Sequence, residues 1–246
     1  MDFNHRKPFH IFALLLVLVT IFFYFIYPIY AFITNQSISQ SEELQDIIGN
    51  LTIEIYFLIT ELIFAFILLV FIPLSWYIIV NSISFRKAIS KIRITLENID
   101  IAFLWGIFAA ILIYMIIFVF SFILQSLGTN PTDLSNVTDL DFLSPPILFV
   151  LVAVIPVAEE IFFRGFLLEK IRSFAGQNVA IVATSVLFGI AHIAYGKLFP
   201  VIMPMIMGLL LAYIVIKTKN LFASIFAHVS FNVVVIILYF LGKSLV

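Results

Sequence analysis

Long apolar runs alternate with short polar segments along the chain. A helix needs about 20 apolar residues to cross the hydrocarbon core of a bilayer. The runs are continuous and do not alternate residue by residue, which excludes a transmembrane barrel. We therefore predict an all-α, polytopic integral membrane protein with about seven transmembrane helices, within a range of six to eight. The predicted spans cover residues 9–33, 55–80, 101–127, 147–168, 179–195, 198–216 and 221–241.

Composition supports this fold class and excludes several functions. Of 246 residues, 63% are hydrophobic and 11% are charged, and a soluble domain could not bury so much apolar surface. The formal net charge is -1, so nucleic acid is not an expected partner. Membrane lipid is an expected partner because of the apolar spans. Cysteine is absent, which excludes disulfides and thiolate chemistry. No cleavable signal peptide is expected.

The chain is expected to form one structural domain with two parts. Residues 1–144 carry three predicted spans and no motif. Residues 145–246 carry four predicted spans and the residues that suggest chemistry. The oligomeric state is left open.

Lysine and arginine are distributed unevenly over the predicted loops. Cytoplasmic loops of membrane proteins carry an excess of these residues. The loops at residues 34–50 and 128–146 contain acidic residues and no Lys or Arg. We therefore predict a multi-pass protein of the cell membrane with its N-terminus in the cytoplasm and its C-terminus outside. The basic residues of the predicted cytoplasmic segments are Arg6, Lys7, Arg86, Lys87, Lys91, Arg93, Lys170, Arg172, Lys217 and Lys219, and the exceptions to the pattern are Lys197 and Lys243.

Two adjacent carboxylates and an arginine interrupt the fourth apolar run. Each such charge costs ~2.5–3.5 kcal/mol at the centre of a membrane helix, so the three together indicate a function. Glu160 and Arg164 are four residues apart and can pair on one helix face. Glu159 is turned ~100° away, so its carboxylate remains for other chemistry. We predict a structural pair that orients Glu159.

Further polar side chains are expected at the depth of Glu159. At about 1.5 Å per residue, Glu159, His192 and Asn232 all lie about 18–20 Å from the cytoplasmic ends of their spans. His228 lies one turn lower. His228 and Asn232 share a helix face, as do Phe188 and His192. The sequence therefore predicts one functional cluster at two adjacent depths in the membrane.

The second span has two interpretations. It can include Glu61, or it can begin at Leu62 and leave Glu54 and Glu61 on an interfacial helix. We expect the second arrangement.

The cluster suits hydrolysis of a peptide bond by an activated water. A carboxylate can act as the base, and an imidazole and an amide can donate to an oxyanion. Glu159, His192 and His228 could also hold Zn²⁺ with an open fourth position, although no His-Glu-x-x-His helix is present. We favour a site without a cofactor, with Zn²⁺ as the alternative.

Two other classes of function fit a buried polar cluster. An ion-coupled transporter could use these residues as a proton relay, but no inverted repeat is visible in the sequence. A catalytically idle membrane scaffold could bind a partner in the same cavity.

Three motifs follow one another on the fourth, fifth and seventh spans: Glu159-Glu160-x-x-x-Arg164, Phe188-x-x-x-His192 and His228-x-x-x-Asn232. In this order they resemble the CAAX-protease and bacteriocin-processing (CPBP, or Abi) family of intramembrane endopeptidases, which includes the type II CAAX prenyl proteases. The resemblance extends over residues 145–241.

The resemblance implies a role for each matching residue. Glu159 and His192 would activate the water that attacks the scissile carbonyl, and His228 and Asn232 would stabilise the oxyanion. The Glu160–Arg164 pair would be the supporting salt bridge. The implied substrate is a peptide, either a prenylated CAAX-type protein or the leader of a secreted peptide.

Overall fold

The structure is a computed structural model that describes residues 3–34, 50–128, 143–195 and 199–244. These residues form helices and no strand, so the predicted all-α membrane fold is confirmed. Six helices are long and apolar enough to cross a membrane. The predicted fifth span is shorter than expected, because its α-helix covers only Gln177–Ile190. The two acidic loops predicted between spans lie largely outside the described residues.

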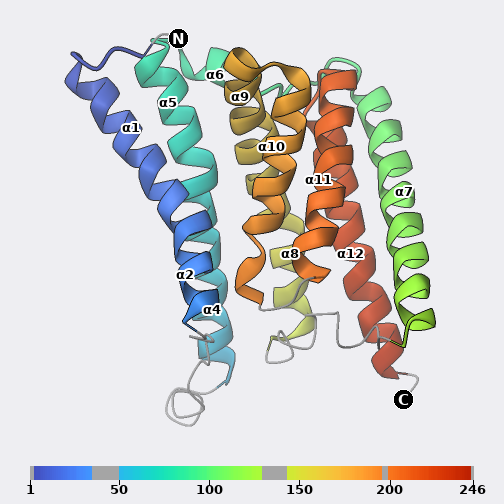
Figure 1. Cartoon of the computed structure of the whole chain (residues 1–246). Coiled ribbons are helices and arrows are strands. Elements are labelled where there is room, and N and C mark those ends of the chain that lie inside the picture. Colours follow the sequence, from blue (N-terminus) through green and yellow to red (C-terminus); the bar gives the residue numbers. More distant parts are fainter. Residues whose placement is uncertain (1–2, 35–49, 129–142, 196–198, 245–246) are drawn as a thin grey trace.

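The elements follow one another in this order along the chain (Figure 1): α1 (Pro8–Ile21), η1 (Phe22–Ile26), α2 (Tyr27–Ile33), α4 (Asn50–Ala65), η2 (Phe66–Phe71), α5 (Ile72–Val80), α6 (Phe85–Lys91), α7 (Ile99–Ser126), α8 (Pro145–Glu160), η5 (Ile161–Leu167), α9 (Leu168–Ala175), α10 (Gln177–Ile190), η6 (Ile193–Tyr195), α11 (Phe199–Thr218) and α12 (Phe222–Ser244). Here η1, η2 and η5 are π-helical turns inside longer helices, and η6 is a 3₁₀ turn.

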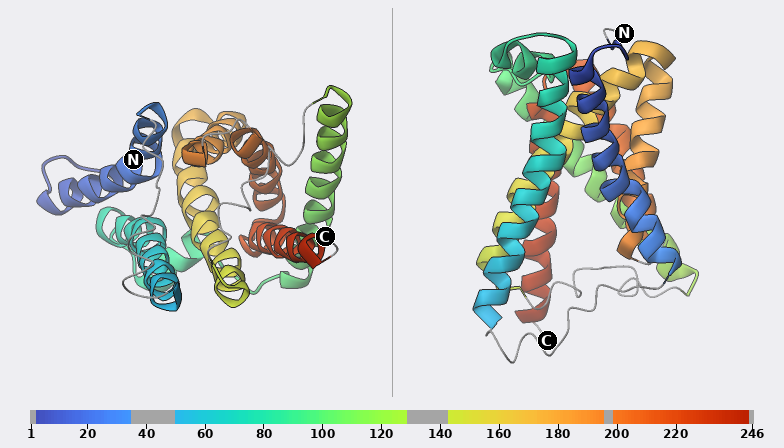
Figure 2. Two further views of the ribbon diagram at one scale, coloured as in Figure 1. Left: turned by 90° about the horizontal axis from the view of Figure 1, so that it is seen from below. Right: turned by 90° about the vertical axis from the view of Figure 1, so that its left-hand side faces the viewer.

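The continuous helix formed by α8, η5 and α9 occupies the centre of the bundle. Figure 2 shows it between the α1–α5 helices on one side and α12 with α7 on the other. Its α8 part packs on α4 and α12, and its η5 and α9 parts pack on α10. It is the most buried of the six long helices, whereas α7 is the most exposed. Of the six long helices it is therefore the best shielded from lipid.

The first two helices contain π-helical turns, each placed next to a proline. Pro28 follows η1 and Pro73 follows η2. A proline has no N–H to donate to the carbonyl four residues earlier, and π-turns are one way in which a helix accommodates such a break. The third π-turn, η5, contains no proline.

The second long helix corrects one sequence prediction. It runs without a break from Leu51 to Val80, so Glu54 and Glu61 lie on the spanning helix and not on a separate interfacial one. Glu54 is buried, and its Oε2 accepts the backbone N–H of Ser144 at 2.9 Å. A carboxylate is stabilised at a helix N-terminus, and this contact joins α4 to the start of α8.

The basic segments gather at one end of the bundle. The N-terminal segment, α6 and the turns after α9 and α11 all lie at the top in Figure 1. The first and last described residues are at opposite ends of the molecule. Which end faces the cytoplasm stays a prediction from the charge distribution.

Helices α10 and α11 lie in direct backbone contact because each presents a glycine to the other. A Cβ at Gly189 would lie 2.5 Å from the carbonyl oxygen of Val201 and 2.9 Å from Cβ of Met205. A Cβ at Gly208 would lie 2.9 Å from Cα of Ser185. The atoms met are backbone atoms or lie next to the backbone, so a side chain cannot be inserted without moving a helix.

The close contact predicts that Gly189→Ala destabilises the protein. Overpacking of this kind costs typically ~1–3 kcal/mol. The measurement is the thermal unfolding midpoint in detergent, with Val182→Ala as the control, because Val182 is 54% exposed on the same helix. An unchanged midpoint for Gly189→Ala would contradict the close packing of α10 on α11.

Candidate active site

A buried ion pair occupies the centre of the candidate site. Nη1 of Arg164 donates to Oε1 of Glu160 at 2.6 Å, and neither side chain is exposed. The pairing that the four-residue spacing predicts is therefore present. Because a buried charge is stable only with a partner, each residue holds the other in place.

The local helix geometry around this pair differs from the regular α-helix assumed from the sequence. Glu159 and Glu160 end α8, and Arg164 lies in the π-turn η5. π-Turns are often found at functional sites. No proline or other break marks η5 in the sequence, so sequence reasoning did not find it.

His228 of α12 lies between the two glutamates. Its Nδ1 is 2.9 Å from Oε1 of Glu160, and its Nε2 is 3.8 Å from Oε2 of Glu159. The one-turn offset that the sequence predicts for His228 does not keep its side chain away from Glu159. A depth count along parallel helices ignores helix tilt and side-chain reach, and these bring the imidazole to both carboxylates.

The geometry fixes the tautomer of both histidines. Oε1 of Glu160 is an acceptor when ionised, so Nδ1 of His228 donates to it. Nδ1 of His192 is 2.8 Å from the carbonyl oxygen of Phe188 and likewise carries the proton. In these tautomers the proton of each ring is on Nδ1, and Nε2 is the atom that can accept a hydrogen bond.

His192 lies just beyond the end of α10, in the turn before η6. Its ring centroid is 5.0 Å from that of Phe188, which in turn is 5.6 Å from that of His228, and this places His192 in the same cluster. The hydrogen bond to Phe188 holds the ring against the last turn of α10. The structure thus brings His192, Glu159 and His228 together, as the sequence predicts.

Phe188 is the apolar centre of the cluster. Its ring lies 5.0 Å from the His192 ring and 5.6 Å from the His228 ring, both in edge-to-face geometry. The Arg164 guanidinium lies over the same ring at 4.3 Å, and Phe163 contacts it at 4.9 Å. One side chain therefore orients both histidines and adds a cation–π contact to the buried arginine.

Asn232 lies one turn beyond His228 on α12 and is half-buried. No hydrogen bond of its side chain is found within the described part of the chain. The neighbouring carbonyl of Phe231 accepts a hydrogen bond from the Tyr114 hydroxyl of α7. Tyr114, which sequence reasoning missed, thereby anchors α12 to α7 next to the site.

Three buried polar atoms of the ion pair have no hydrogen-bond partner among the residues described: Glu160 Oε2, Arg164 Nε and Arg164 Nη2. Buried polar groups without a protein partner are normally satisfied by ordered water. Ordered water would satisfy these atoms of the ion pair.

Glu159, His192 and His228 are the residues that the sequence offers as zinc ligands. Within the described ranges, no three His, Asp or Glu side chains converge as a metal ion requires. Nδ1 of His228 and Nδ1 of His192 are engaged by Glu160 and by the Phe188 carbonyl, so only their Nε2 atoms could reach a metal ion. Because the side chains do not converge on one point, Glu159, His192 and His228 do not fit a zinc site in this arrangement.

Comparison with known proteins agrees with the resemblance in the motifs. Residues 141–234 match the model of the Rce1-like family, described as type II CAAX prenyl endopeptidase Rce1-like. The resemblance to CAAX proteases is confirmed. The matched segment contains every residue of the cluster described above.

One curated relative comes from Bacillus subtilis (strain 168) and is named "Putative membrane peptidase YdiL". It is 29% identical over 149 residues, which cover 58% of this chain and 58% of the relative. The chain thus matches somewhat over half the length of that protein. No solved structure matches the chain significantly.

The buried pair predicts that Arg164→Ala destabilises the protein strongly. Removing the guanidinium leaves the Glu160 carboxylate uncompensated, which costs ~3–5 kcal/mol. The measurement is thermal unfolding in detergent. Arg172→Ala is the control, because Arg172 pairs with Glu169 on the same helix with its side chain 35% exposed, and an exposed pair contributes only ~0–1 kcal/mol. Equal midpoints for the two variants would contradict the assignment of a buried pair.

Proposed function

We propose that the protein is an intramembrane endopeptidase that hydrolyses a peptide bond with a water activated by Glu159 and His192. The observation that carries this proposal is the position of the His228 ring between the two glutamates, inside the segment that matches the Rce1-like family. Glu160 is neutralised by Arg164, whereas Glu159 keeps a partly exposed side chain. One carboxylate thus supports the site, and the other is available to a substrate.

Glu159 is the proposed base. It takes a proton from the attacking water, and the resulting hydroxide adds to the scissile carbonyl carbon. The proton later goes to the leaving amine, so that the two products are a carboxylic acid and an amine. With the Nδ1 proton of neutral His192 directed at the Phe188 carbonyl, its Nε2 atom is an acceptor and can orient the water through a hydrogen bond.

His228 and Asn232 are the proposed oxyanion donors. The Asn232 amide can donate without any change of protonation. His228 already donates from Nδ1 to Glu160, so donation from Nε2 requires the doubly protonated ring. Glu159 and Glu160 place two carboxylates beside that ring.

The proposed substrate is a peptide that is presented at the membrane. The family description supports a prenylated CAAX-type protein, and the leader of a secreted peptide has the same scissile chemistry. Ion-coupled transport and an idle scaffold remain the alternatives, and a cleavage assay separates them from the proposal.

The mechanism predicts that Glu159→Gln abolishes cleavage and leaves the fold intact. A general base contributes about 10²–10⁴-fold to the rate, so residual turnover should be below about 10% of wild type. The measurement is cleavage of prenylated and leader peptides by the purified protein in proteoliposomes. Glu61→Gln is the control, since it makes the same change on a membrane helix away from the cluster. Full turnover by Glu159→Gln would remove Glu159 from the mechanism.

The poor fit to zinc predicts that activity survives exhaustive chelation. The purified, active protein should contain well under one equivalent of zinc by elemental analysis, and chelator-treated protein should keep its turnover. Stoichiometric zinc together with chelator-sensitive activity that zinc restores would make this a metalloprotease and overturn the proposed mechanism.

A further inference from the structure

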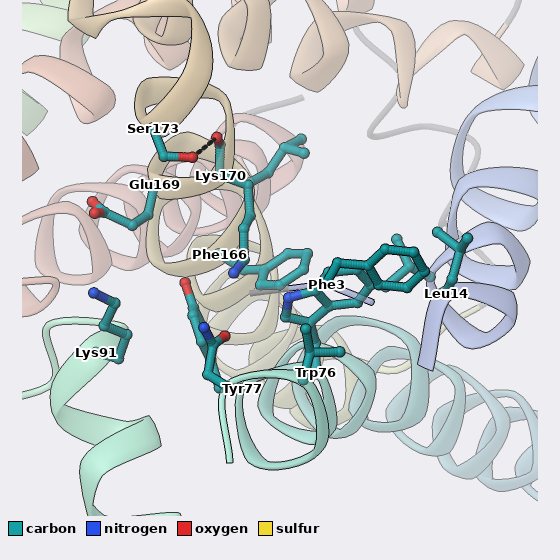
Figure 3. Close-up of a pocket in the computed structure, with 13 residues that line it drawn as sticks. Phe3, Leu14, Trp76, Tyr77, Lys91, Phe166, Glu169, Lys170 and Ser173 are labelled. Atoms are coloured by element: carbon teal, nitrogen blue, oxygen red, sulfur yellow. Dashed lines mark hydrogen bonds between the residues drawn. The ribbon is translucent and has the colours of Figure 1, made fainter. Parts of the chain in front are cut away.

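A second cavity lies at the Lys/Arg-rich end of the bundle, away from the candidate active site. Its volume is about 520 Å³, within the range of ~300–1,000 Å³ typical of small-molecule sites. It is bounded by the N-terminal segment with α1, the end of α5, the end of α6, and α9 (Figure 3). No residue of the proposed hydrolytic mechanism lines it.

One wall of this cavity is aromatic. The Phe3 ring stacks on Trp76 at 5.9 Å with an interplanar angle of 9°. Trp76 meets Phe166 at 6.2 Å, and Tyr77 meets Phe166 at 5.6 Å, both edge to face. Leu14 of α1 extends this apolar surface (Figure 3). The wall can therefore receive a hydrocarbon chain.

The cavity also carries cations. Lys91 and Lys170 line it directly, and the Lys170 ammonium lies 4.4 Å from the Tyr77 ring centroid. Glu169 is the one carboxylate in the lining, and it pairs with Arg93 at 3.0 Å and with Arg172 at 2.9 Å. The charge of that carboxylate is thus already matched by two arginines, and Lys91 and Lys170 are the cations in the lining.

The Tyr77 hydroxyl indicates that the cavity can hold a ligand. Tyr77 is completely buried and its side chain lines the cavity, with the hydroxyl directed toward Glu169 and Lys170 (Figure 3). Its oxygen has no hydrogen-bond partner in the described part of the chain. A buried tyrosine hydroxyl usually has such a partner, and a ligand oxygen in the cavity would supply it.

We propose that this cavity binds the headgroup of an anionic phospholipid from the leaflet at the Lys/Arg-rich end. The phosphate lies between Lys91 and Lys170 and accepts a hydrogen bond from the Tyr77 hydroxyl. The parts of the acyl chains next to the headgroup lie along Trp76 and Phe166. The aromatic wall distinguishes a lipid from free phosphate, because an inorganic ion would leave it without a contact. Basic pockets between membrane helices recognise anionic headgroups by the same chemistry.

The test uses the purified, delipidated full-length protein and native mass spectrometry. Phosphatidylglycerol and phosphatidylcholine with identical acyl chains are titrated in parallel. We expect phosphatidylglycerol to bind about tenfold more tightly. Lys91→Gln and Lys170→Gln should each weaken its binding about fivefold. Lys87→Gln is the matched control, since it removes one exposed charge from α6 outside the cavity and should change the affinity less than twofold.

Tyr77→Phe gives the sharpest result. It should weaken phosphatidylglycerol binding about tenfold, because a hydrogen bond to a charged group is lost. It should not lower the unfolding midpoint of the lipid-free protein, since the hydroxyl has no protein partner to lose. A lower midpoint without lipid, or unchanged lipid affinity, would overturn the proposal.

Two competition experiments identify the occupant. Millimolar inorganic phosphate should not displace phosphatidylglycerol, and neither should a farnesylated peptide with a free carboxylate. Displacement by phosphate would make this a simple anion site, and displacement by the peptide would assign the cavity to a peptide ligand. Either result would overturn the lipid assignment. Equal affinity for the two phospholipids would overturn it as well, and all these outcomes are independent of the proteolysis assay.

Discussion

The buried carboxylate of Glu160 is the constraint on which the rest of the structure depends. One of its oxygens accepts from Arg164 and from His228, which come from the same helix and from α12. Unpaired, such a charge in an apolar interior would cost several kcal/mol. The site and the helix bundle therefore form together, because the packing of α12 on α8 brings His228 to the Glu160 carboxylate.

Phe188 extends this coupling to α10. Its ring contacts Arg164 and both histidines, and its carbonyl accepts the His192 hydrogen bond. The glycine contacts between α10 and α11 fix the height at which α10 ends. Close backbone packing of α10 on α11 thus positions His192 next to the cluster residues of the neighbouring helices.

The central helix also joins the cluster to the cavity at the Lys/Arg-rich end. Glu160 and Lys170 lie ten residues apart on one continuous helix, or about 15 Å at the usual rise. Phe162, Phe163 and Phe166 fill the distance between them with buried aromatic rings. A rigid, packed element of this kind transmits displacements because a close-packed interior cannot absorb them locally.

The sequence alone determined the membrane fold and the Glu160–Arg164 pair, and it named the residues proposed for the site. Apolar runs and four-residue spacings are local properties, and a helix converts them directly into spans and shared faces. Only the tertiary structure decided that His228 lies between both glutamates and that Glu54 contacts the start of α8. It also placed Tyr77 and Lys170 at one cavity. These contacts join residues some 70 to 90 positions apart, and helix tilt, π-turns and glycine contacts set their distances. No one-dimensional pattern records those quantities.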